Sequence, residues 1–588
     1  MEEPSNFRKW LLFGAIGVGL FFIGRTWIFG SGDAPVTQPL AKDDWGTSPE
    51  GDRPEAASCT LVDERSELTF SSRGAAMTGA RMRDPKYSES VEKPDSRIDL
   101  VSTSREQRMP LRTSLRATTD SDTEQLVPTD NLDFKLTESS ASSCTFVFEN
   151  ENAIVTRTIT KNARPFEVDV TTKVQNKSAV VRRFRLTVEQ TSWRAASDTE
   201  ASFWDLGRRP EWMTDVVTHT DKGTERHLPP AFDPGEFTTE NGFTSEHFLG
   251  SEGTGKFAAV TANYFTAAVM HQSGAAPSAE TLIEDGAFYQ VPAGHPQFGH
   301  MYRARLAYPE ATLAAGEEAS YVVTAFAGPK ERRVLETAGG TKGDLLETID
   351  LGIFGVLGKI FLTYVDWLFA LVKSWGWAIA LLTITVKLVV FPLTLPQLRT
   401  TVAMRRVKPE LDAITEKYAD DMMQKNVAMQ ELYRKEGIRP ALGCLPLLLQ
   451  MPVWIALYQA LSTEVGLLHT PFTALIPDLT HSDPYHVIPI VLGASSFLQQ
   501  KMMLYMMPGI FTAMMFFMPA GLGVYMLTNT WLGIIQQVLV ERWVKSKLAG
   551  GTSSKIEVRD VTKSGTKKDP GSDSERSALT KGKVRARG

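Results

Sequence analysis

The hydrophobic positions of this 588-residue chain follow two different patterns. Between residues 57 and 335, apolar and polar residues alternate in short segments such as Phe166–Val174 and Val180–Val188, which predicts strands with one buried face. Beyond residue 350 the apolar residues form long runs, and Trp375–Leu395 is about as long as one helix that spans a bilayer. We therefore expect an antiparallel β-sandwich followed by a polytopic α-helical membrane domain.

Six apolar segments predict membrane spans. They are an uncleaved anchor within residues 1–30, a second span over 373–396, and four spans within 443–541, at Cys444–Leu461, Pro484–Gln500, Met502–Met518 and Leu522–Val540. Lysine and arginine gather after Leu395 and again after Val540, and such clusters mark the cytoplasmic side of a membrane. Both termini are then cytoplasmic, and the β domain (residues 57–335) lies on the outer side.

Three other segments of the outer side have distinct compositions. Residues 31–56 are rich in Pro, Gly and Asp, which predicts a linker. The stretch Ser88–Asn131 is polar and irregular, and we expect a long excursion between strands. Residues 351–372 are apolar but carry Lys359 and Asp366, so we expect a helix that lies in the outer interface of the membrane and does not cross it.

The cytoplasmic segments are amphipathic or basic. Residues 397–440 show two helical hydrophobic patterns separated by Asp420-Asp421, which predicts an αα-hairpin. Residues 549–588 have few apolar residues and an excess of Lys and Arg, which predicts a disordered tail. Basic residues of both segments are expected to contact ribosomal RNA or the membrane surface: Arg399, Arg405, Arg406, Lys408, Lys567, Lys568, Lys583, Arg585 and Arg587.

One lysine, Lys387, lies inside the second predicted span. An ammonium at membrane depth costs at least about 2.5–3.5 kcal/mol on insertion scales. Counting on to Leu395 at the helical rise places Lys387 about 12 Å from the cytoplasmic end, which is farther than its side chain reaches. The alternatives are a lysine that extends toward the lipid headgroups and a water-filled cavity within the membrane. The sequence favours the cavity.

Polar residues also recur at helical spacing in the other spans. Interhelical hydrogen bonds could explain any one of them, but together with Lys387 they predict a hydrophilic groove. The residues predicted to line it are Lys387, Thr383, Gln450, Tyr458, Asn529 and Gln536. The spans contain no paired carboxylates, no nucleophile with a base and no metal cluster, so we expect neither an enzyme nor a cofactor.

The remaining candidate chemistry is weak. Cys59, Cys144 and Cys444 lack the spacing of a zinc or redox motif. The first two fall in the outer domain, where a disulfide could persist, and the sequence leaves open whether they pair. The histidines, His469, His481 and His486 among them, show no recognised metal-ligand spacing and are expected to be loop residues, with no metal bound. The string GSEGTGK at 250–256 resembles a phosphate loop but lacks its Ser or Thr and precedes a strand.

Several strings resemble the YidC/Oxa/Alb family of membrane protein insertases, in its Gram-negative form with a large periplasmic domain. They are TVKLVVFPLT (385–394), KPELDAITEKY (408–418), GCLPLLLQMPVWIALYQAL (443–461), PFTALIPDLTHSDPY (471–485), FMPAGLGVYMLTN (517–529) and IIQQ (534–537). The resemblance implies a five-helix core around a groove, and a periplasmic supersandwich similar to sugar-binding folds. It also implies residence in the bacterial inner membrane.

The function that this resemblance implies is insertion and folding of newly made proteins in the inner membrane, alone or with the Sec translocon. The partners would be nascent membrane proteins, the Sec translocon, the ribosome and the lipid bilayer. Contacts with the substrate are expected at Met451, Trp454, Tyr525 and Met526.

Three positions depart from the family pattern. The groove residue, usually arginine, is Lys387, which keeps the charge but lacks the planar fork of a guanidinium. Met526 stands where a tyrosine is expected after Tyr525, and the second cytoplasmic loop is nearly absent at Lys501. A charge role at Lys387 is therefore better supported than a specific geometry.

Two functions of other classes remain. In an ion- or proton-coupled transporter, Lys387 would bind or relay the ion, but the internal repeats common in transporters are not found in this sequence. A membrane-tethered carbohydrate-binding protein would explain the outer domain alone.

Overall fold

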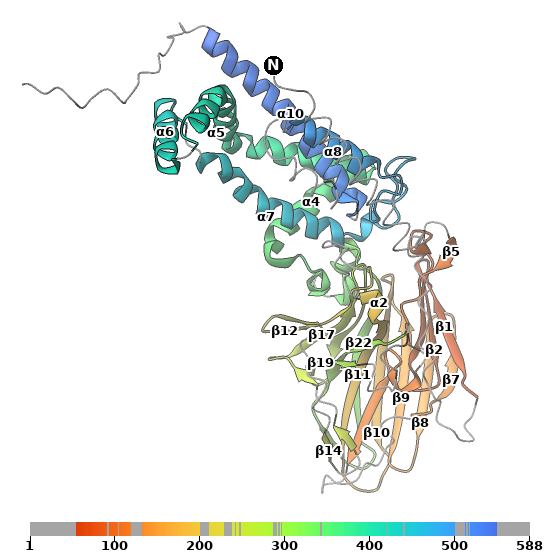
Figure 1. Ribbon diagram of the computed structural model, residues 1–588. Coiled ribbons are helices and arrows are strands. Elements are labelled where there is room, and N and C mark those ends of the chain that lie inside the picture. The colour runs from red at the N-terminus through yellow and green to blue at the C-terminus, as the bar shows by residue number, and fades with distance from the viewer. Residues whose placement is uncertain are drawn as a thin grey trace, which may run out of the picture.

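The computed structural model describes residues 55–549 apart from 91–92, 104, 119–131, 200–210, 229–237, 241–242, 246–247, 286–290, 292–294, 296, 341–343, 420, 439–440, 500–511, 513–514 and 517. A β domain and a helical domain are joined end to end (Figure 1). The predicted anchor, nearly all of the linker, most of the predicted span Met502–Met518, the shortened loop at Lys501 and the basic tail lie outside the described residues.

The β domain consists mainly of two stacked antiparallel sheets. The nine-stranded sheet has the order β13 (Thr224–His227), β12 (Asp215–Thr220), β17 (Gly255–Thr261), β18 (Phe265–Ser273), β22 (Glu318–Pro329), β10 (Glu167–Asn176), β9 (Ala153–Lys161), β8 (Ser143–Glu149) and β7 (Lys135–Ser139). The six-stranded sheet has the order β16 (Leu249–Gly250), β19 (Ser278–Asp285), β20 (Gly299–Ala307), β11 (Arg182–Ala195) and β21 (Ala311–Leu313), with β6 (Thr113–Thr118) also paired to β11. These sheets confirm the predicted antiparallel sandwich.

Smaller elements surround the sandwich. They are a three-stranded sheet of β1 (Ser58–Val62), β2 (Ser66–Ser71) and β3 (Met77–Met82), the hairpins β4 (Ser88–Ser90)–β5 (Lys93–Arg97) and β14 (Thr238–Glu240)–β15 (Phe243–Ser245), and the short helices α2 (Ala196–Thr199), η1 (Glu106–Arg108), α3 (Arg332–Leu335), η5 (Ala338–Gly340) and η6 (Asp344–Thr348).

Alternating residues form the core between the sheets. In β9 every second residue from Ala153 to Ile159 is buried. Val170 of β10 pairs with Ile159 on one side and Val323 on the other, and all three are buried. The alternation in sequence thus becomes a buried layer that is largely apolar and is interrupted in β9 by the buried Arg157.

One sequence expectation in this domain is wrong. Within the stretch Ser88–Asn131, β6 extends the six-stranded sheet by pairing with β11, and Leu115 lies opposite Leu186 in the core. Leu115 is the single large apolar residue of β6, so the hydrophobic pattern was too weak to indicate a strand. The strand forms because its backbone pairs with the long strand β11.

Cys59 and Cys144 form a disulfide. It joins β1 to β8, which are 85 residues apart at the two cysteines, and both residues are buried. The bond settles the pairing that the sequence left open, and it suits an oxidising compartment such as the periplasm.

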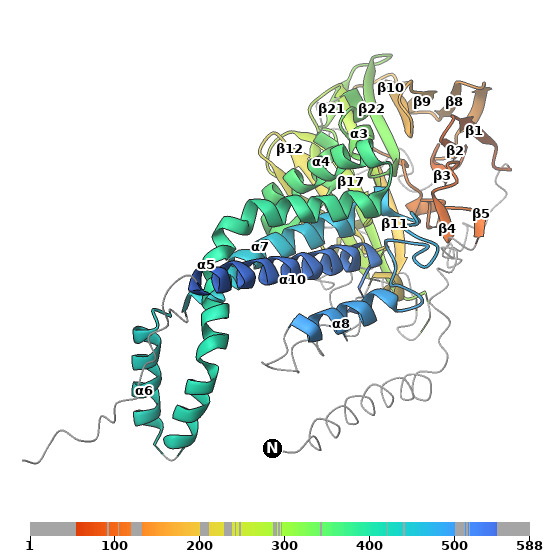
Figure 2. The same cartoon turned by 90° about the horizontal axis from the view of Figure 1, so that it is seen from above.

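Among the described residues, six longer helices make the second domain. They are α4 (Gly355–Val372), α5 (Trp375–Lys417), α6 (Met422–Lys435), α7 (Ala441–Thr463), α8 (Val487–Gln499) and α10 (Ala520–Ala549), with the short turns η7 (Gly352–Phe354) and η8 (Val465–Leu467). Helix α5 packs against α4, α7 and α10, while α8 packs on α10 (Figure 2). The segments Gly352–Val372 and Trp375–Pro396 are long and apolar enough to cross a membrane. The count of six spans stays a prediction.

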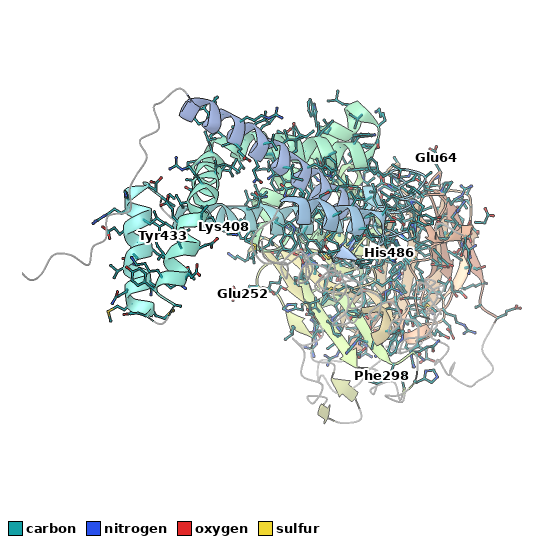
Figure 3. All side chains as sticks on the ribbon, turned by 45° about the horizontal axis from the view of Figure 1, so that its top comes forward. Glu64, Glu252, Phe298, Lys408, Tyr433 and His486 are labelled. Atoms are coloured by element: carbon teal, nitrogen blue, oxygen red, sulfur yellow. A yellow bond between two sulfur atoms is a disulfide. The ribbon has the colours of Figure 1, made fainter. Side chains whose placement is uncertain are left out.

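The hairpin predicted for residues 397–440 is present. Helix α5 runs without interruption from the predicted span into the hairpin and ends at Lys417. The side chain of Asp421 caps α6 by accepting hydrogen bonds from the backbone of Met423 and Gln424, as the turn prediction implied. Val407 and Leu432 share a small core of the hairpin's own. Figure 3 shows Lys408 and Tyr433 on this hairpin, far from His486 at the junction of the two domains.

Candidate insertion site

The predicted groove residues come from three helices that pack together, α5, α7 and α10. One contact joins two of these helices, and a second lies within α7. The Nε2 of Gln450 on α7 donates a hydrogen bond to the hydroxyl of Tyr525 on α10 at 3.2 Å. The rings of Trp454 and Tyr458 stack on α7 with centroids 6.3 Å apart, as expected for residues one helical turn apart.

Lys387 occupies a boundary position on α5. Its side chain is half-buried, whereas the next two residues, Leu388 and Val389, are 65% and 70% exposed. Within the described residues, the structure gives its ammonium no hydrogen-bond or ion-pair partner. A charge held at the edge of an apolar helix without a partner needs water or a polar ligand nearby.

Thr383 lies one turn before Lys387 and is almost fully buried. Its hydroxyl donates to the carbonyl of Ile379 in its own helix at 2.8 Å, so it offers no free donor to a groove in this conformation. Asn529 and Gln536 are half-buried on α10, seven residues apart and hence on one face of that helix. The polar side chains on α10 are therefore more accessible than the hydroxyl of Thr383.

The four predicted substrate contacts differ in accessibility. Met451 is 43% exposed, and Met526 packs at the margin of the bundle core. Tyr525 is buried, so a substrate could reach it only if the contact between α7 and α10 opened. The indole Nε1 of Trp454 is buried without a hydrogen-bond partner in the part of the chain that the structure describes. A buried donor of this kind costs about 1–3 kcal/mol until a ligand or water satisfies it.

The basic residues that the sequence predicts to be cytoplasmic lie on α5 or beyond the described residues. Arg406 forms an ion pair with Glu436 across the hairpin, which reduces the charge that it presents. Lys408 is half-buried on the same helix. The backbones of Arg399 and Arg405 are helical, and the five basic tail residues lie outside the described chain.

Sequence reasoning missed a cluster in the outer loop (residues 462–486), which joins α7 to α8. The Nδ1 atoms of His469 and His481 lie 2.9 Å and 3.0 Å from the same oxygen, Oδ2 of Asp478. Burial alone would raise the pKa of Asp478, but the two imidazoles lower it well below its usual range. The spacing Asp-x-x-His of Asp478 and His481 is visible in the sequence. The turn that brings His469 next to Asp478 is not.

A buried glutamate, Glu464, lies beside this loop. Burial raises its pKa to about 7, and the nearby Asp366 adds to the shift. Its side chain accepts a hydrogen bond from the backbone of Gly466 at 2.8 Å, and the Nζ of Lys86 in the β domain donates to the carbonyl of Gly466 at 3.1 Å. Titratable groups therefore cluster where the two domains meet.

Comparison with known proteins identifies this architecture. A sequence model described as the YidC periplasmic domain matches residues 59–364, which is more than half of the chain. The chain belongs to the YidC family of membrane protein insertases. A second family model, described as the 60Kd inner membrane protein, matches residues 367–547. The chain is thus a membrane protein with a periplasmic domain, which is the β domain described above.

Named relatives agree with the family. A membrane protein insertase YidC of Anaeromyxobacter dehalogenans strain 2CP-1 is 31% identical over 510 residues, which cover 82% of this chain and 84% of the relative. The YidC of Nitrosococcus oceani is 38% identical over 257 residues, which cover 42% of this chain and 47% of the relative. Such relatives are named insertases, and insertases are not enzymes.

Solved structures give weaker likenesses. A crystal structure of an active YidC insertase with its first transmembrane domain resolved has a TM-score of 0.34 and 15% identity, covering 90% of this chain and 99% of the other. A galactose mutarotase-like protein of Lactobacillus casei has a TM-score of 0.30 and 12% identity, covering 46% of this chain and 100% of the other. At scores this low neither likeness supports a conclusion.

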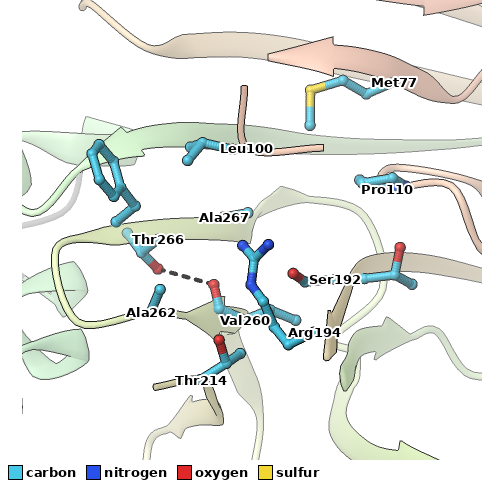
Figure 4. Close-up of a pocket in the computed structure, with 12 residues that line it drawn as sticks. Met77, Leu100, Pro110, Ser192, Arg194, Thr214, Val260, Ala262, Thr266 and Ala267 are labelled. Carbon is cyan, nitrogen blue, oxygen red and sulfur yellow. Dashed lines mark hydrogen bonds between the residues drawn. The ribbon is translucent and has the colours of Figure 1, made fainter. Parts of the chain in front are cut away.

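The periplasmic domain contains a small cavity beside Arg194 (Figure 4). Its volume is about 20 Å³, which is room for about one water molecule. The guanidinium of Arg194 lies 4.7 Å from the ring centre of Trp212, and its Nε and Nη1 have no hydrogen-bond partner among the described residues. The space is too small for a sugar or a peptide segment.

Proposed function

We propose that this chain inserts newly made proteins into the inner membrane through a hydrophilic groove between α5, α7 and α10, with Lys387 as its fixed positive charge. The observation that carries the proposal is the position of Lys387, half-buried on an apolar helix and without a partner among the described residues. An unpaired ammonium is tolerated there only where water or a polar substrate segment solvates it. Membership of the YidC family supports the same reading.

In this mechanism the groove shortens the hydrocarbon path that a polar segment must cross. Lys387 attracts acidic or polar parts of the translocated segment, and the unsatisfied Nε1 of Trp454 offers them a donor. The exposed Met451 receives the apolar helix of the substrate, since methionine adapts to many apolar sequences. Partitioning of apolar surface into lipid at roughly 25 cal/mol per Å² drives the process, and the membrane potential adds about 2.3 kcal/mol per charge per 100 mV.

The topology is part of the proposal. It comprises six spans with both termini in the cytoplasm, an interfacial helix over residues 351–372, a cytoplasmic hairpin over 397–440 and a basic tail over 549–588. The segment of 351–372 is also apolar and long enough to span, but a crossing there would place the next loop, with its basic residues, on the outer side. The hairpin and the tail would meet the ribosome, and the protein would act alone or beside the Sec translocon.

A reconstituted insertion assay tests the role of Lys387. Ribosomes carrying a single-span protein with an acidic translocated segment are supplied to liposomes that contain the purified protein. We expect Lys387→Gln to lower insertion at least tenfold and Lys387→Arg to retain most of it, because the charge is kept. Lys359→Gln, an exposed lysine on α4, is the matched control and should insert at the wild-type rate.

Crosslinking locates the path. A photo-reactive residue at Met451 should capture the apolar segment of a stalled nascent membrane protein, and one at Trp454 should capture the polar segment beside it. Neither should capture a soluble nascent chain. Equal insertion by Lys387→Gln and wild type, or absence of crosslinks from both positions, would refute the groove mechanism. A solute flux in liposomes that is abolished by Lys387→Ala would favour the transporter alternative.

A further inference from the structure

The cluster in the outer loop has the composition of a metal site. Two imidazole nitrogens and one carboxylate oxygen converge, and the three atoms all lie within 4.8 Å of one another. Ligands about 2.0–2.1 Å from a tetrahedral zinc ion are roughly 3.3 Å apart, so ring movements on the order of 1 Å would complete the geometry. Two histidines and an aspartate are ligand types that zinc takes, and water commonly fills a fourth position.

Hydrogen bonds with residues outside the cluster orient two of these ligands, as such bonds do in metal sites. The Oδ1 of Asp478 accepts hydrogen bonds from the backbone and hydroxyl of Thr480 at 2.7 Å and 2.6 Å, which turns Oδ2 toward the two imidazoles. The Nε2 of His469 lies 3.1 Å from the carbonyl oxygen of Ser88. Donation from Nε2 to that carbonyl leaves Nδ1 with a lone pair aimed at the cluster. A ligand histidine usually has such an outer acceptor.

The backbone holds the ligands in place. His469 has a φ of 50°, a left-handed conformation that costs on the order of 1–2 kcal/mol in a residue other than glycine and persists only where surrounding structure fixes it. Leu479, between the other two ligands, donates to the carbonyl of Thr470 at 3.1 Å. The carbonyl of His481 accepts from Ala520, the first residue of α10, at 2.8 Å. The loop is therefore ordered before any ion binds.

We propose that His469, Asp478 and His481 bind a divalent transition metal ion, with zinc as the best match, and that the ion fastens the periplasmic domain to the outer ends of the helices. The outer loop supplies the ligands, Ser88 in β4 supplies the outer acceptor, and Ala520 ties the site to α10. The ion would thus join three parts of the chain at the junction.

A titration distinguishes a metal ion from a proton. The full chain, purified in detergent and freed of metal with a chelator, is titrated with ZnCl₂ at pH 7.5 by calorimetry. We expect one ion per chain with a dissociation constant in the micromolar range or below. Bound Co²⁺ should show the intense visible absorption of a four- or five-coordinate site.

Matched variants assign the site. His481→Gln, at a partly exposed side chain, and Asp478→Asn should each weaken zinc binding at least tenfold, whereas His486→Gln, at a nearby outer-loop histidine outside the cluster, should bind as the wild type does. Equal unfolding temperatures in chelator would show that His481→Gln is folded. Zinc should raise the unfolding temperature of the wild type and not of His481→Gln. Failure of the wild type to bind zinc saturably, or equal binding by His481→Gln, would overturn the proposal and leave a hydrogen-bonded ion pair.

Discussion

The β domain and the helical domain treat charge and apolar surface in opposite ways. In the β domain, Arg303 is buried and paired with Glu189 and Glu284 at 2.7 Å and 3.0 Å. In the helical domain, Lys387 is half-buried without a partner among the described residues, while large apolar side chains such as Leu388 and Trp531 face outward. The first pattern suits a fold that excludes water from its core, and the second suits a helix bundle whose solvent is lipid. The charge of Arg303 serves structure, whereas the charge of Lys387 remains available for function.

Removing each charge should break this comparison most clearly. Arg303→Met removes the cation between Glu189 and Glu284 and leaves the buried Glu284 with Arg108 at 3.6 Å, and we expect it to destabilise the β domain by about 3 kcal/mol. Lys387→Met removes a charge that no described residue pairs, so it should leave the unfolding temperature unchanged or raised while insertion falls. Thermal unfolding followed by circular dichroism, together with the insertion assay, measures both effects. Similar destabilisation by the two variants would contradict the contrast.

The disulfide offers a second way to separate the domains. Replacing Cys59 and Cys144 by serine frees a link between residues 85 apart, and we expect the β domain to lose about 2–4 kcal/mol, chiefly because its unfolded chain gains freedom. Denaturant unfolding of the full chain with and without a reductant gives the value. The apparent midpoint of the helical domain should not move, and a reductant should not affect the double variant.

Glu464 tests the junction between the domains. Its folded pKa is about 7, above the unfolded value, so the folded state binds an extra proton between about pH 4.5 and 7 and stability falls as pH rises through that window. Because the carboxyl is fully buried, the loss amounts to about 3 kcal/mol at pH 8. Glu464→Gln should match the wild type at pH 4.5 and exceed it at pH 8.

Unfolding temperatures at several pH values check this prediction. The exposed Glu252, labelled in Figure 3, provides the control, and Glu252→Gln should follow the wild-type profile. A wild-type stability that rises between pH 5 and 8, with the same rise in Glu464→Gln, would show that Glu464 is ionised at little cost.

Local patterns in the sequence were sufficient for much of the fold. Alternation gave β9 and β10 because each buries one face along its whole length, and the acid before α6 indicated its start. The strand β6 was missed because it relies on backbone pairing with β11. The continuity of α5 past Leu395 was not foreseen either, since the change from lipid-facing to cytoplasmic composition resembles a boundary although the backbone has none.

The sequence indicates which types of residue form the candidate site, but not how those residues are arranged. An internal lysine in an apolar run signals itself, because its cost is intrinsic to the residue. The hydroxyl of Thr383 bonds within its own helix. The bond between Gln450 and Tyr525 depends on how distant helices pack, and the convergence of His469 on Asp478 depends on how the outer loop folds. No spacing rule within a single segment encodes such contacts. The roles assigned to the groove and the basic residues stay predictions.

The unbroken helix α5 can also act as a mechanical lever. It spans 43 residues, with Pro392, Pro396 and Pro409 inside it, and each proline removes a backbone hydrogen bond and so creates a point of bending. From Pro396 to Lys417 the arm is roughly 32 Å long, so a tilt of about 10° at the proline would move the hairpin tip by about 5 Å. The hairpin could then tilt to meet a large body at its tip while the segment that carries Lys387 keeps its place in the bundle.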